Sequence, residues 1–205
     1  MGVREVINGR SFSTKVGGCV MDPEVIQAMQ EASRSFVRIE DLEEAASRTI
    51  SQITGAEAGY VTSGAAAGLT LAMAACLTGL DPEKMNRLPD TRGMKNEVII
   101  QRGHRNDYDH ALRAAGARVK EIGFNYATFP YELERAIDEK TAAVFYLAGI
   151  ADGSLPIARV TEIAGENGVP VIVDASAELP PRENLRRFIG HGADLVVFSL
   201  SLIHI

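Results

Sequence analysis

Apolar residues recur along the chain in two patterns that alternate with each other. One has helical spacing, and the other is a short run that is apolar at nearly every position. Short runs rich in β-branched residues, without polar alternation, are typical of strands that helices cover on both faces. We predict strands at 57–62, 97–101, 118–122, 142–147, 169–173 and 194–198.

Helical spacing fills most of the chain between these runs. Asp22 is suited to cap a helix that starts at Pro23, because proline lacks the amide hydrogen that would be unpaired there. In that helix Val25 and Met29 share one face, and the next helix is expected to end at Gly55. The remaining helices are predicted at 41–53, 65–80, 108–115, 131–137, 157–166 and 182–189.

This alternation of strands and helices predicts an α/β fold. We expect a mostly parallel sheet with helices on both faces and right-handed crossovers. In this fold class, ligands bind beyond the carboxyl ends of the strands. Candidate chemistry is therefore expected at the residues that follow each strand.

The composition is that of an ordinary globular protein, with 205 residues, 46% of them hydrophobic and 23% charged. It excludes the disordered, collagen-like and low-complexity classes. The net charge of −6 argues against a chain that coats a nucleic-acid backbone, because that task needs a surplus of Lys and Arg. Cys19 and Cys76 are too few for a disulfide framework and lack the spacing of a zinc site, so no metal is expected.

No segment has the pattern of a signal peptide or a membrane span. Residues 1–10 carry charged side chains and no continuous apolar core. The longest apolar run, 65–80, is short for a bilayer and rich in Ala and Gly, which favours a buried helix. We therefore expect a soluble protein of the cytoplasm, with no membrane partner.

A segment of small residues, Ser63-Gly64-Ala65, lies between the first predicted strand and its helix. Small residues let an anion approach the backbone, and the first amides of a helix are unpaired donors that the helix dipole reinforces. The segment is a candidate phosphate site, although it matches neither the dinucleotide fingerprint nor the P-loop. Tight packing of the helix start is the alternative interpretation.

Three further polar residues follow predicted strands: His104 the second, Asp174 the fifth and Ser199 the last. A loop histidine is more often a surface or capping residue, and Asp174 also fits a helix N-cap or a ribose-binding acid. Beside His104, Arg102 and Arg105 have guanidinium groups suited to a substrate carboxylate or phosphate. A phosphate site, a histidine and a carboxylate at one edge together match pyridoxal phosphate, with its phosphate, planar ring and pyridine nitrogen.

Four runs, in order, carry a resemblance to a known family: 6–10, 61–68, 97–106 and 171–175. They resemble the selenocysteine synthase-like family of pyridoxal-phosphate enzymes, whose members have the aspartate-aminotransferase fold, also called fold type I. The likeness extends from 6 to 199. The cofactor-binding residues that it implies are Ser63, Gly64 and Ala65 at the phosphate, His104 on the ring, Asp174 at the pyridine nitrogen, and Ser199 after the last strand.

The chain departs from the family at one decisive position. In the family the last strand is followed by Ser-Gly-Gly-Lys, whose lysine binds the cofactor covalently, whereas here Ser199 is followed by Leu200, Ser201 and Leu202. Leu202 stands where the lysine is expected, and leucine has no amine to bind the cofactor or to move a substrate proton. No catalytic residue is therefore identified, and this chain is expected to be inactive by itself.

The resemblance also divides the chain into parts. Residues 1–55 are expected to form an N-terminal segment with two helices, 56–199 an incomplete cofactor-binding large domain, and 200–205 an aberrant tail that continues an apolar strand. The small C-terminal domain of the family is expected to be absent. Related enzymes are dimers that share their active sites, so a homodimer or higher homo-oligomer is expected of a complete homologue.

Four functions remain open at this point. The preferred one is a pyridoxal-phosphate lyase or transferase acting on a small amino acid or amino-sugar acid, such as an ammonia lyase on a phosphorylated glucosaminate. The second is a selenium transferase acting on seryl-tRNA, against which the acidic balance argues. The others are a non-catalytic cofactor-binding fragment and a Rossmann-type dinucleotide-binding protein, for which the glycine fingerprint is missing.

Overall fold

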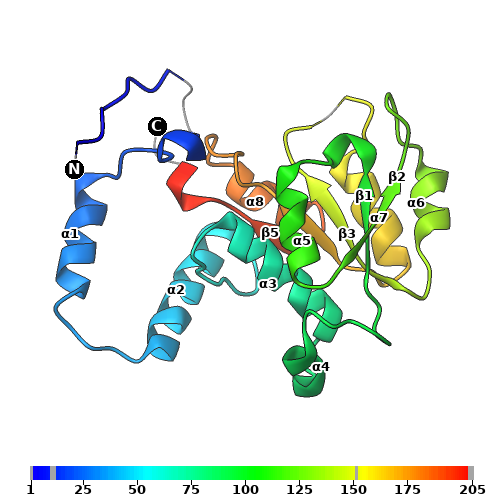
Figure 1. Cartoon of the computed structure of the whole chain (residues 1–205), viewed down its shortest axis with the longest axis horizontal. Helices are drawn as coiled ribbons and strands as arrows, with labels where there is room; N and C mark the ends of the chain where they lie inside the picture. The colour runs from blue at the N-terminus through cyan, green and yellow to red at the C-terminus, as the bar shows by residue number, and fades with distance from the viewer. Residues whose placement is uncertain (1, 10–12, 151, 203–205) are drawn as a thin grey trace.

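A computed structural model describes residues 2–9, 13–150 and 152–202, and it shows a five-stranded sheet between two layers of helices (Figure 1). The strand order is β2-β1-β3-β4-β5, and all neighbouring strands are parallel. The predicted α/β class is thereby confirmed. The strands are β1 (Glu97–Gln101), β2 (Arg118–Ile122), β3 (Thr141–Leu147), β4 (Val171–Asp174) and β5 (Leu195–Val197).

The helices follow the predicted order, with one addition. The α-helices are α1 (Pro23–Ala32), α2 (Ile39–Thr54), α3 (Ala65–Thr78), α4 (Pro82–Arg87), α5 (His110–Ala114), α6 (Pro130–Ala136), α7 (Ile157–Glu166) and α8 (Asn184–Gly190). Short 3-10 helices lie at η1 (Thr14–Val16), η2 (Arg102–His104), η3 (Asp107–Asp109) and η4 (Leu200–Leu202). None of the helices among the described residues is both long and apolar enough to cross a membrane.

Two hydrophobic cores lie on opposite faces of the sheet, because side chains of a strand alternate between its faces. Val144 and Tyr146 of β3 join the core covered by α6, α7 and α8. Ala143 and Phe145 of the same strand join the core covered by α3 and α5. Strands β3 and β4 are thus buried on both sides, which explains why their sequences are continuously apolar.

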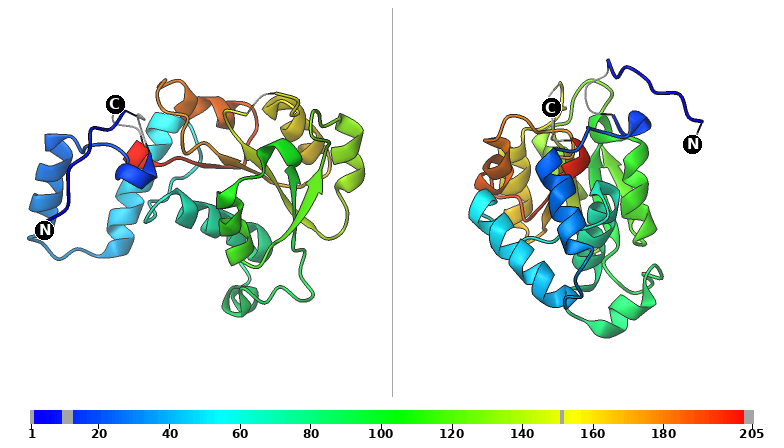
Figure 2. Two further views of the ribbon diagram at one scale, coloured as in Figure 1. Left: turned by 45° about the horizontal axis from the view of Figure 1, so that its top comes forward. Right: turned by 90° about the vertical axis from the view of Figure 1, so that its left-hand side faces the viewer.

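In the N-terminal arm (residues 13–54), α1 stands away from the rest of the molecule (Figure 2), whereas the end of α2 is bound by Arg186 of α8. The start of α1 and the end of α2 are as predicted: the Asp22 carboxylate accepts a hydrogen bond from the amide of Glu24 at 2.9 Å, and Gly55 ends α2 with a φ of 77°. Helix α2 begins at Ile39, two residues before the predicted start. No residue of α1 or α2 is buried. The apolar residues that recur at helical spacing in α1 and α2 therefore do not correspond to buried positions.

The strand predicted at 57–62 does not form, and that prediction was wrong. The backbone amides of Gly59 and Val61 are bound by the side chains of Ser47 and Glu43 on α2, at 3.0 and 3.2 Å. A side chain on Gly59 would lie 2.4 Å from a methyl carbon of Ile50, so glycine allows this close approach to α2. The segment pairs with a helix instead of a strand, although its residue types favour a strand.

Two other differences are smaller. Helix α4 lies where no helix was predicted, although Asp81 and Pro82 start it in the same way as Asp22 and Pro23 start α1. Residues 200–202 form a single 3-10 turn, so the tail does not continue as a strand. The rest of the predicted tail, 203–205, lies outside the described residues, as does Arg10 of the first motif.

Candidate functional site

Helix α3 starts at the predicted phosphate segment. Ser63 and Gly64 are exposed, and no described side chain caps the helix. Gly64 has a φ of 152°, which disfavours residues with a side chain, and a Cβ there would have no atom within 4 Å. The amides of the first turn therefore face open space at the positive end of the helix dipole, as an anion site requires.

Close packing places this helix start over the end of β5. A Cβ on Gly68, in the first turn of α3, would lie 2.9 Å from Cγ1 of Val197. Only glycine fits there without displacing the side chain of Val197. Val197 is the last residue of β5, so the open amides of α3 lie at the carboxyl edge of the sheet.

Asp174 lies at the same edge, as the last residue of β4. It is paired in the sheet with Val197 of β5 on one side and with Leu147 of β3 on the other. Its side chain is buried, and one carboxylate oxygen accepts a hydrogen bond from the amide of Ser176 at 3.0 Å. A buried carboxylate with few hydrogen bonds is costly, which favours a cationic or hydrogen-bonding partner at this position.

His104 is fully buried beside the end of β3. The amide of Leu147 donates to Nδ1 at 3.2 Å, and the ring meets Tyr146 edge-on, with centroids 4.6 Å apart. Because Nδ1 accepts, the proton of the neutral ring is on Nε2, which has no hydrogen-bond partner among the described residues. Burial lowers the pKa of His104 to about 4, against a smaller opposing effect of the Ile150 backbone.

These contacts connect the predicted residues in space. Gly68 touches Val197, Val197 pairs with Asp174, Asp174 pairs with Leu147, and Leu147 binds His104. The α3 start, Asp174 and His104 therefore lie at one edge of the sheet, over three neighbouring strands. Helix-start amides, a carboxylate and an aromatic ring are the groups that would recognise a planar ligand with an anionic group at one end.

Ser199 lies two residues beyond β5 and is buried, with its hydroxyl 3.2 Å from that of Ser201. The N-terminal segment covers the next residues, since the Cys19 amide donates to the Ser201 carbonyl at 2.9 Å. Leu202 completes the turn with a hydrogen bond from its amide to the Ser199 carbonyl. The position of the family lysine is therefore close to the predicted edge, but it carries an aliphatic side chain.

Arg102 and Arg105, considered above as substrate ligands, are already engaged by carboxylates of the chain. Both bind Glu121 at 2.7 Å, and Arg105 also binds the buried Asp109 at 2.5 Å. Hydrogen bonding to Arg102, and to a smaller extent to Arg105, lowers the pKa of Glu121. The sequence contained no signal for this pairing, because Glu121 comes from a strand that is 16 residues beyond Arg105.

Two surface cavities lie elsewhere. One, of about 500 Å³, runs along α1, and the other, of about 410 Å³, lies between α2 and α8. Neither is lined by the predicted site residues. The candidate site is therefore an edge of the sheet and is distinct from these two cavities.

Known proteins match nearly the whole chain. It is 39% identical to D-glucosaminate-6-phosphate ammonia lyase of Salmonella typhimurium, over 97% of this chain and 55% of the relative. It is 36% identical to 5'-C-glycyluridine monooxygenase-decarboxylase of a Streptomyces species, over 97% and 51%. It is 25% identical to L-seryl-tRNA(Sec) selenium transferase of Nitratidesulfovibrio vulgaris, over 96% and 45%. The chain spans about half the length of these relatives, and no family model matches it.

Solved structures give the same picture. The structure of D-glucosaminate-6-phosphate ammonia lyase matches with a TM-score of 0.93 over 98% of this chain and 55% of that one, at 39% identity. Serine palmitoyltransferase of S. paucimobilis, with bound PLP and myriocin, matches with a TM-score of 0.59 over 88% and 48%, at 15% identity. At that identity the second likeness concerns the fold alone.

The buried His104 predicts a pH dependence of stability. Because its pKa is about 4 in the folded chain and about 6.5 in an unfolded one, the unfolded state takes up the proton first as the pH falls. Stability should therefore decrease between pH 6.5 and pH 4, by about 3 kcal/mol from this group. Urea unfolding measures the free energy of unfolding at pH 7 and at pH 4. Between these two pH values it should fall by about 3 kcal/mol less in His104→Gln than in the wild-type chain. Equal decreases in both proteins would contradict the burial of a neutral ring.

Proposed function

Because this chain is a homologue of D-glucosaminate-6-phosphate ammonia lyase and of selenocysteine synthase-like proteins, with the fold of fold type I pyridoxal-phosphate enzymes, we propose that it binds pyridoxal phosphate at the carboxyl edge of its sheet. We further propose that the complete protein is a lyase acting on an amino acid or amino-sugar acid. The observation that carries the proposal is the set of contacts joining the α3 start, Asp174 and His104.

The residues present fit this cofactor. The uncapped amides after Gly64 match a phosphate, and the buried carboxylate of Asp174 matches a protonated pyridine nitrogen. The imidazole of His104 is an aromatic ring buried at this edge, and its unpartnered Nε2–H is a donor that a bound polar group would satisfy. Ser199 adds a buried hydroxyl near the same edge.

The role of each group follows from its charge. Bound pyridoxal phosphate supplies a ring that accepts electrons from a carbanion next to a substrate nitrogen. Asp174 would keep the pyridine nitrogen protonated, because an adjacent carboxylate favours the charged form. His104 stays neutral above pH 4, so it would hold the ring by contact without adding a positive charge. The amides of Ser63, Gly64 and Ala65 would donate hydrogen bonds to the phosphate, that of Gly64 in exchange for its bond to Oγ1 of Thr62 at 3.4 Å.

Leu202 determines what the chain can do by itself. No amine is present at this position, so the covalent attachment of the cofactor and the proton transfer performed by the family lysine have no agent there. We propose that this chain binds the cofactor reversibly and without turnover. Arg102 and Arg105 are not assigned to the substrate, because both are engaged by Glu121.

Two alternatives have less support. The selenium transferases are relatives at 25% identity, compared with 39% for the ammonia lyase, and the net charge of −6 does not favour a tRNA partner. A dinucleotide-binding function would leave the neutral aromatic ring of His104 at the carboxyl edge without a role.

Both free cysteines agree with a reducing compartment, and we propose the cytoplasm.

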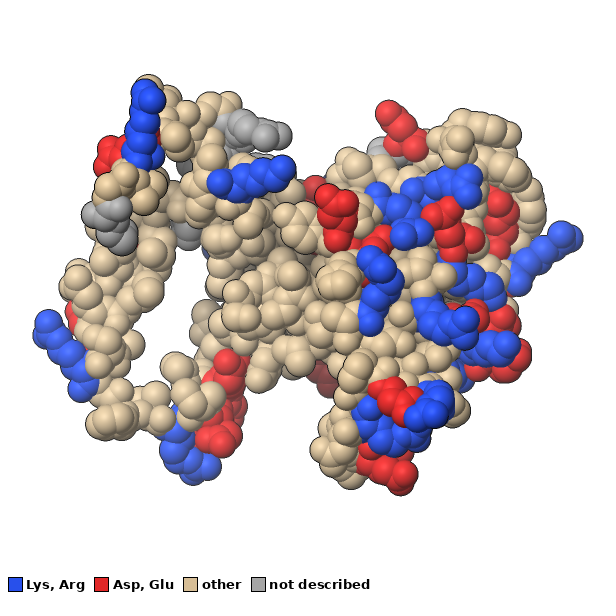
Figure 3. Space-filling model, viewed as in Figure 1, with Lys and Arg blue, Asp and Glu red and all other residues tan. Residues whose placement is uncertain are grey.

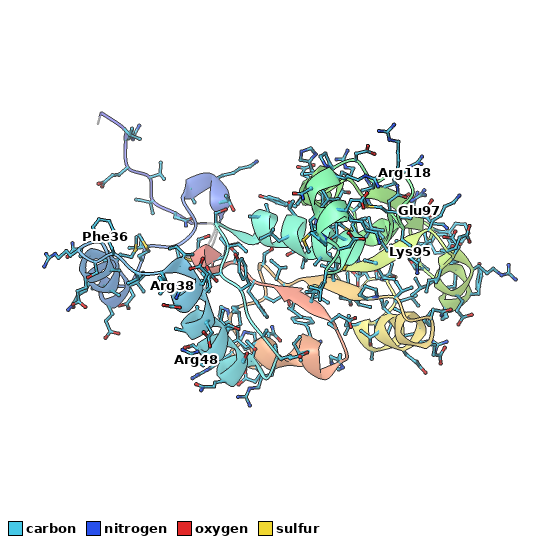
Figure 4. The ribbon with its side chains drawn as sticks, turned by 90° about the horizontal axis from the view of Figure 1, so that it is seen from below. Phe36, Arg38, Arg48, Lys95, Glu97 and Arg118 are labelled. Carbon is cyan, nitrogen blue, oxygen red and sulfur yellow. The ribbon has the colours of Figure 1, made fainter. Side chains whose placement is uncertain are left out.

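We also propose that the protein pairs with a second copy of itself through the N-terminal arm. Ile39 and Leu42 of α2 are 64% and 55% exposed, and Phe36 lies at the outer end of the arm, away from the sheet (Figure 4). Figure 3 shows charged side chains on the arm as well as over α5, β2 and α6, with uncharged surface between those of the arm. Several large exposed apolar residues on one element are typical of a protein interface.

Sedimentation equilibrium tests the pairing. We expect the wild-type chain to form dimers and Phe36→Ser to shift the equilibrium toward monomer, because it removes an apolar ring from the interface. Phe124→Ser, a change of the same kind on the body of the molecule, should leave the dimer intact. A wild-type chain that sediments as a monomer at every concentration would contradict the proposal.

Cofactor binding is tested by titrating the chain with pyridoxal phosphate and following fluorescence. Asp174→Asn should weaken binding by about 2 kcal/mol, or about 30-fold, because the charged partner of the pyridine nitrogen is lost. The control is Asp194→Asn, since Asp194 binds the Val171 amide at the opposite end of β4 and the amide side chain keeps that hydrogen bond. Equal affinities in the two variants would show that Asp174 does not face the cofactor.

Restoring the missing amine tests the role of position 202. Leu202→Lys should attach one pyridoxal phosphate covalently after borohydride reduction, detected as a mass increase of the intact chain. Leu200→Lys, two residues earlier in the same turn, should gain little over the wild-type chain. Labelling of the wild-type chain to the extent of Leu202→Lys would mean that another lysine serves the site.

A further inference from the structure

One carboxylate on the edge strand holds both sides of the turn that carries His104. Glu121 lies on β2, and its Oε1 accepts from Nε of Arg102 at 2.7 Å, while its Oε2 accepts from Nη1 of Arg105 at 2.7 Å. Arg102 precedes His104 by two residues and Arg105 follows it directly. The two ion pairs therefore bind the short η2 turn to β2 from either side of His104.

A second carboxylate, that of Asp109, binds Arg105. Nε of Arg105 binds Oδ2 of Asp109 at 2.5 Å, and the side chain of Asp109 is only 4% exposed. Arg113 of α5 approaches the other oxygen of Asp109 at 3.5 Å. The turn is therefore bound by charge-assisted hydrogen bonds to β2 and to Asp109 of η3, and Asp109 is in turn paired with Arg113 of α5.

The fully buried ring of His104 has few polar contacts of its own. It accepts one hydrogen bond, from the amide of Leu147 at 3.2 Å, and touches the edge of Tyr146. Its Nε2 has no partner among the described residues. The position of the ring therefore depends on the backbone that carries it, and so on the ion pairs that bind η2.

We propose that Glu121 is a positioning residue for His104. By holding Arg102 and Arg105, it sets the backbone of the turn so that the imidazole accepts from Leu147 and keeps its place at the carboxyl edge. The inference deepens the proposed function, because the positioned ring is the one assigned to the cofactor. The first measurement that tests this role, amide hydrogen exchange, needs no cofactor.

The test compares Glu121→Gln with Glu97→Gln in the full chain. Glu97 is a matched control because it pairs with Lys120 at 3.3 Å, at the opposite end of the same two strands. Figure 4 shows Glu97 with Lys95 and Arg118 at that end of the molecule. Hydrogen exchange of individual amides is measured by NMR without cofactor, together with the ¹⁵N shifts of the His104 ring.

We expect exchange of the Leu147 amide to become about tenfold faster in Glu121→Gln, because its acceptor His104 loses its place. The amide of Val144, bound to the Pro170 carbonyl earlier in β3, should keep its rate, and so should both amides in Glu97→Gln. The ¹⁵N shifts of His104 should move in Glu121→Gln alone. Unchanged Leu147 exchange and unchanged His104 shifts would overturn the proposal, and so would equal acceleration of Leu147 and Val144.

Further variants keep the test decisive. Arg102→Gln removes only one of the two ion pairs, so it gives a smaller acceleration at Leu147 in a less disturbed chain, and no acceleration there would also overturn the proposal. Glu121→Asp retains the charge and should restore part of the protection. In a second arm, pyridoxal phosphate should bind Glu121→Gln several-fold more weakly than Glu97→Gln. If the wild-type chain does not bind it, the proposed function fails, while the exchange result still decides the role of Glu121.

Discussion

The pairing of β3 with β4 is the constraint on which the rest of the structure depends. Both strands are buried on their two faces, so their register is determined by the packing of two separate cores. That register sets Leu147 opposite Asp174, and the register of β4 with β5 sets Asp174 opposite Val197. A shift of β4 by one residue against its neighbours would move the side chain of Asp174 to the other face of the sheet and away from its place at the edge.

Much of this arrangement was predictable from the sequence. The bounds of β1, β2 and α7 match the predicted ranges, because apolar runs and helical spacing there agree with the burial that packing produces. Because ligands bind beyond the carboxyl ends of parallel strands, the sequence alone predicted that His104 and Asp174 lie at one edge of the sheet. Their shared neighbour Leu147 was not predicted, since a backbone amide has no signature in a sequence.

The failures have physical causes that local patterns do not contain. The segment 57–62 has strand-forming residues, but Ser47 and Glu43 of α2 bind its amides, and a strand needs another strand beside it. Arg102 and Arg105 were considered as substrate ligands, yet both pair with a carboxylate from a different strand. In each case a partner distant in sequence determined the outcome. The missing amine at Leu202, by contrast, was visible in the sequence alone.

The central claim is that the α3 start, His104 and Asp174 form one cofactor site. A crystal structure of the chain grown with pyridoxal phosphate tests it most directly. The account predicts the phosphate at the amides of Ser63–Ala65, the ring against His104 and the pyridine nitrogen within hydrogen-bond distance of Asp174. Pyridoxal phosphate bound at another surface, with the edge between α3 and β4 left without it, would contradict the account.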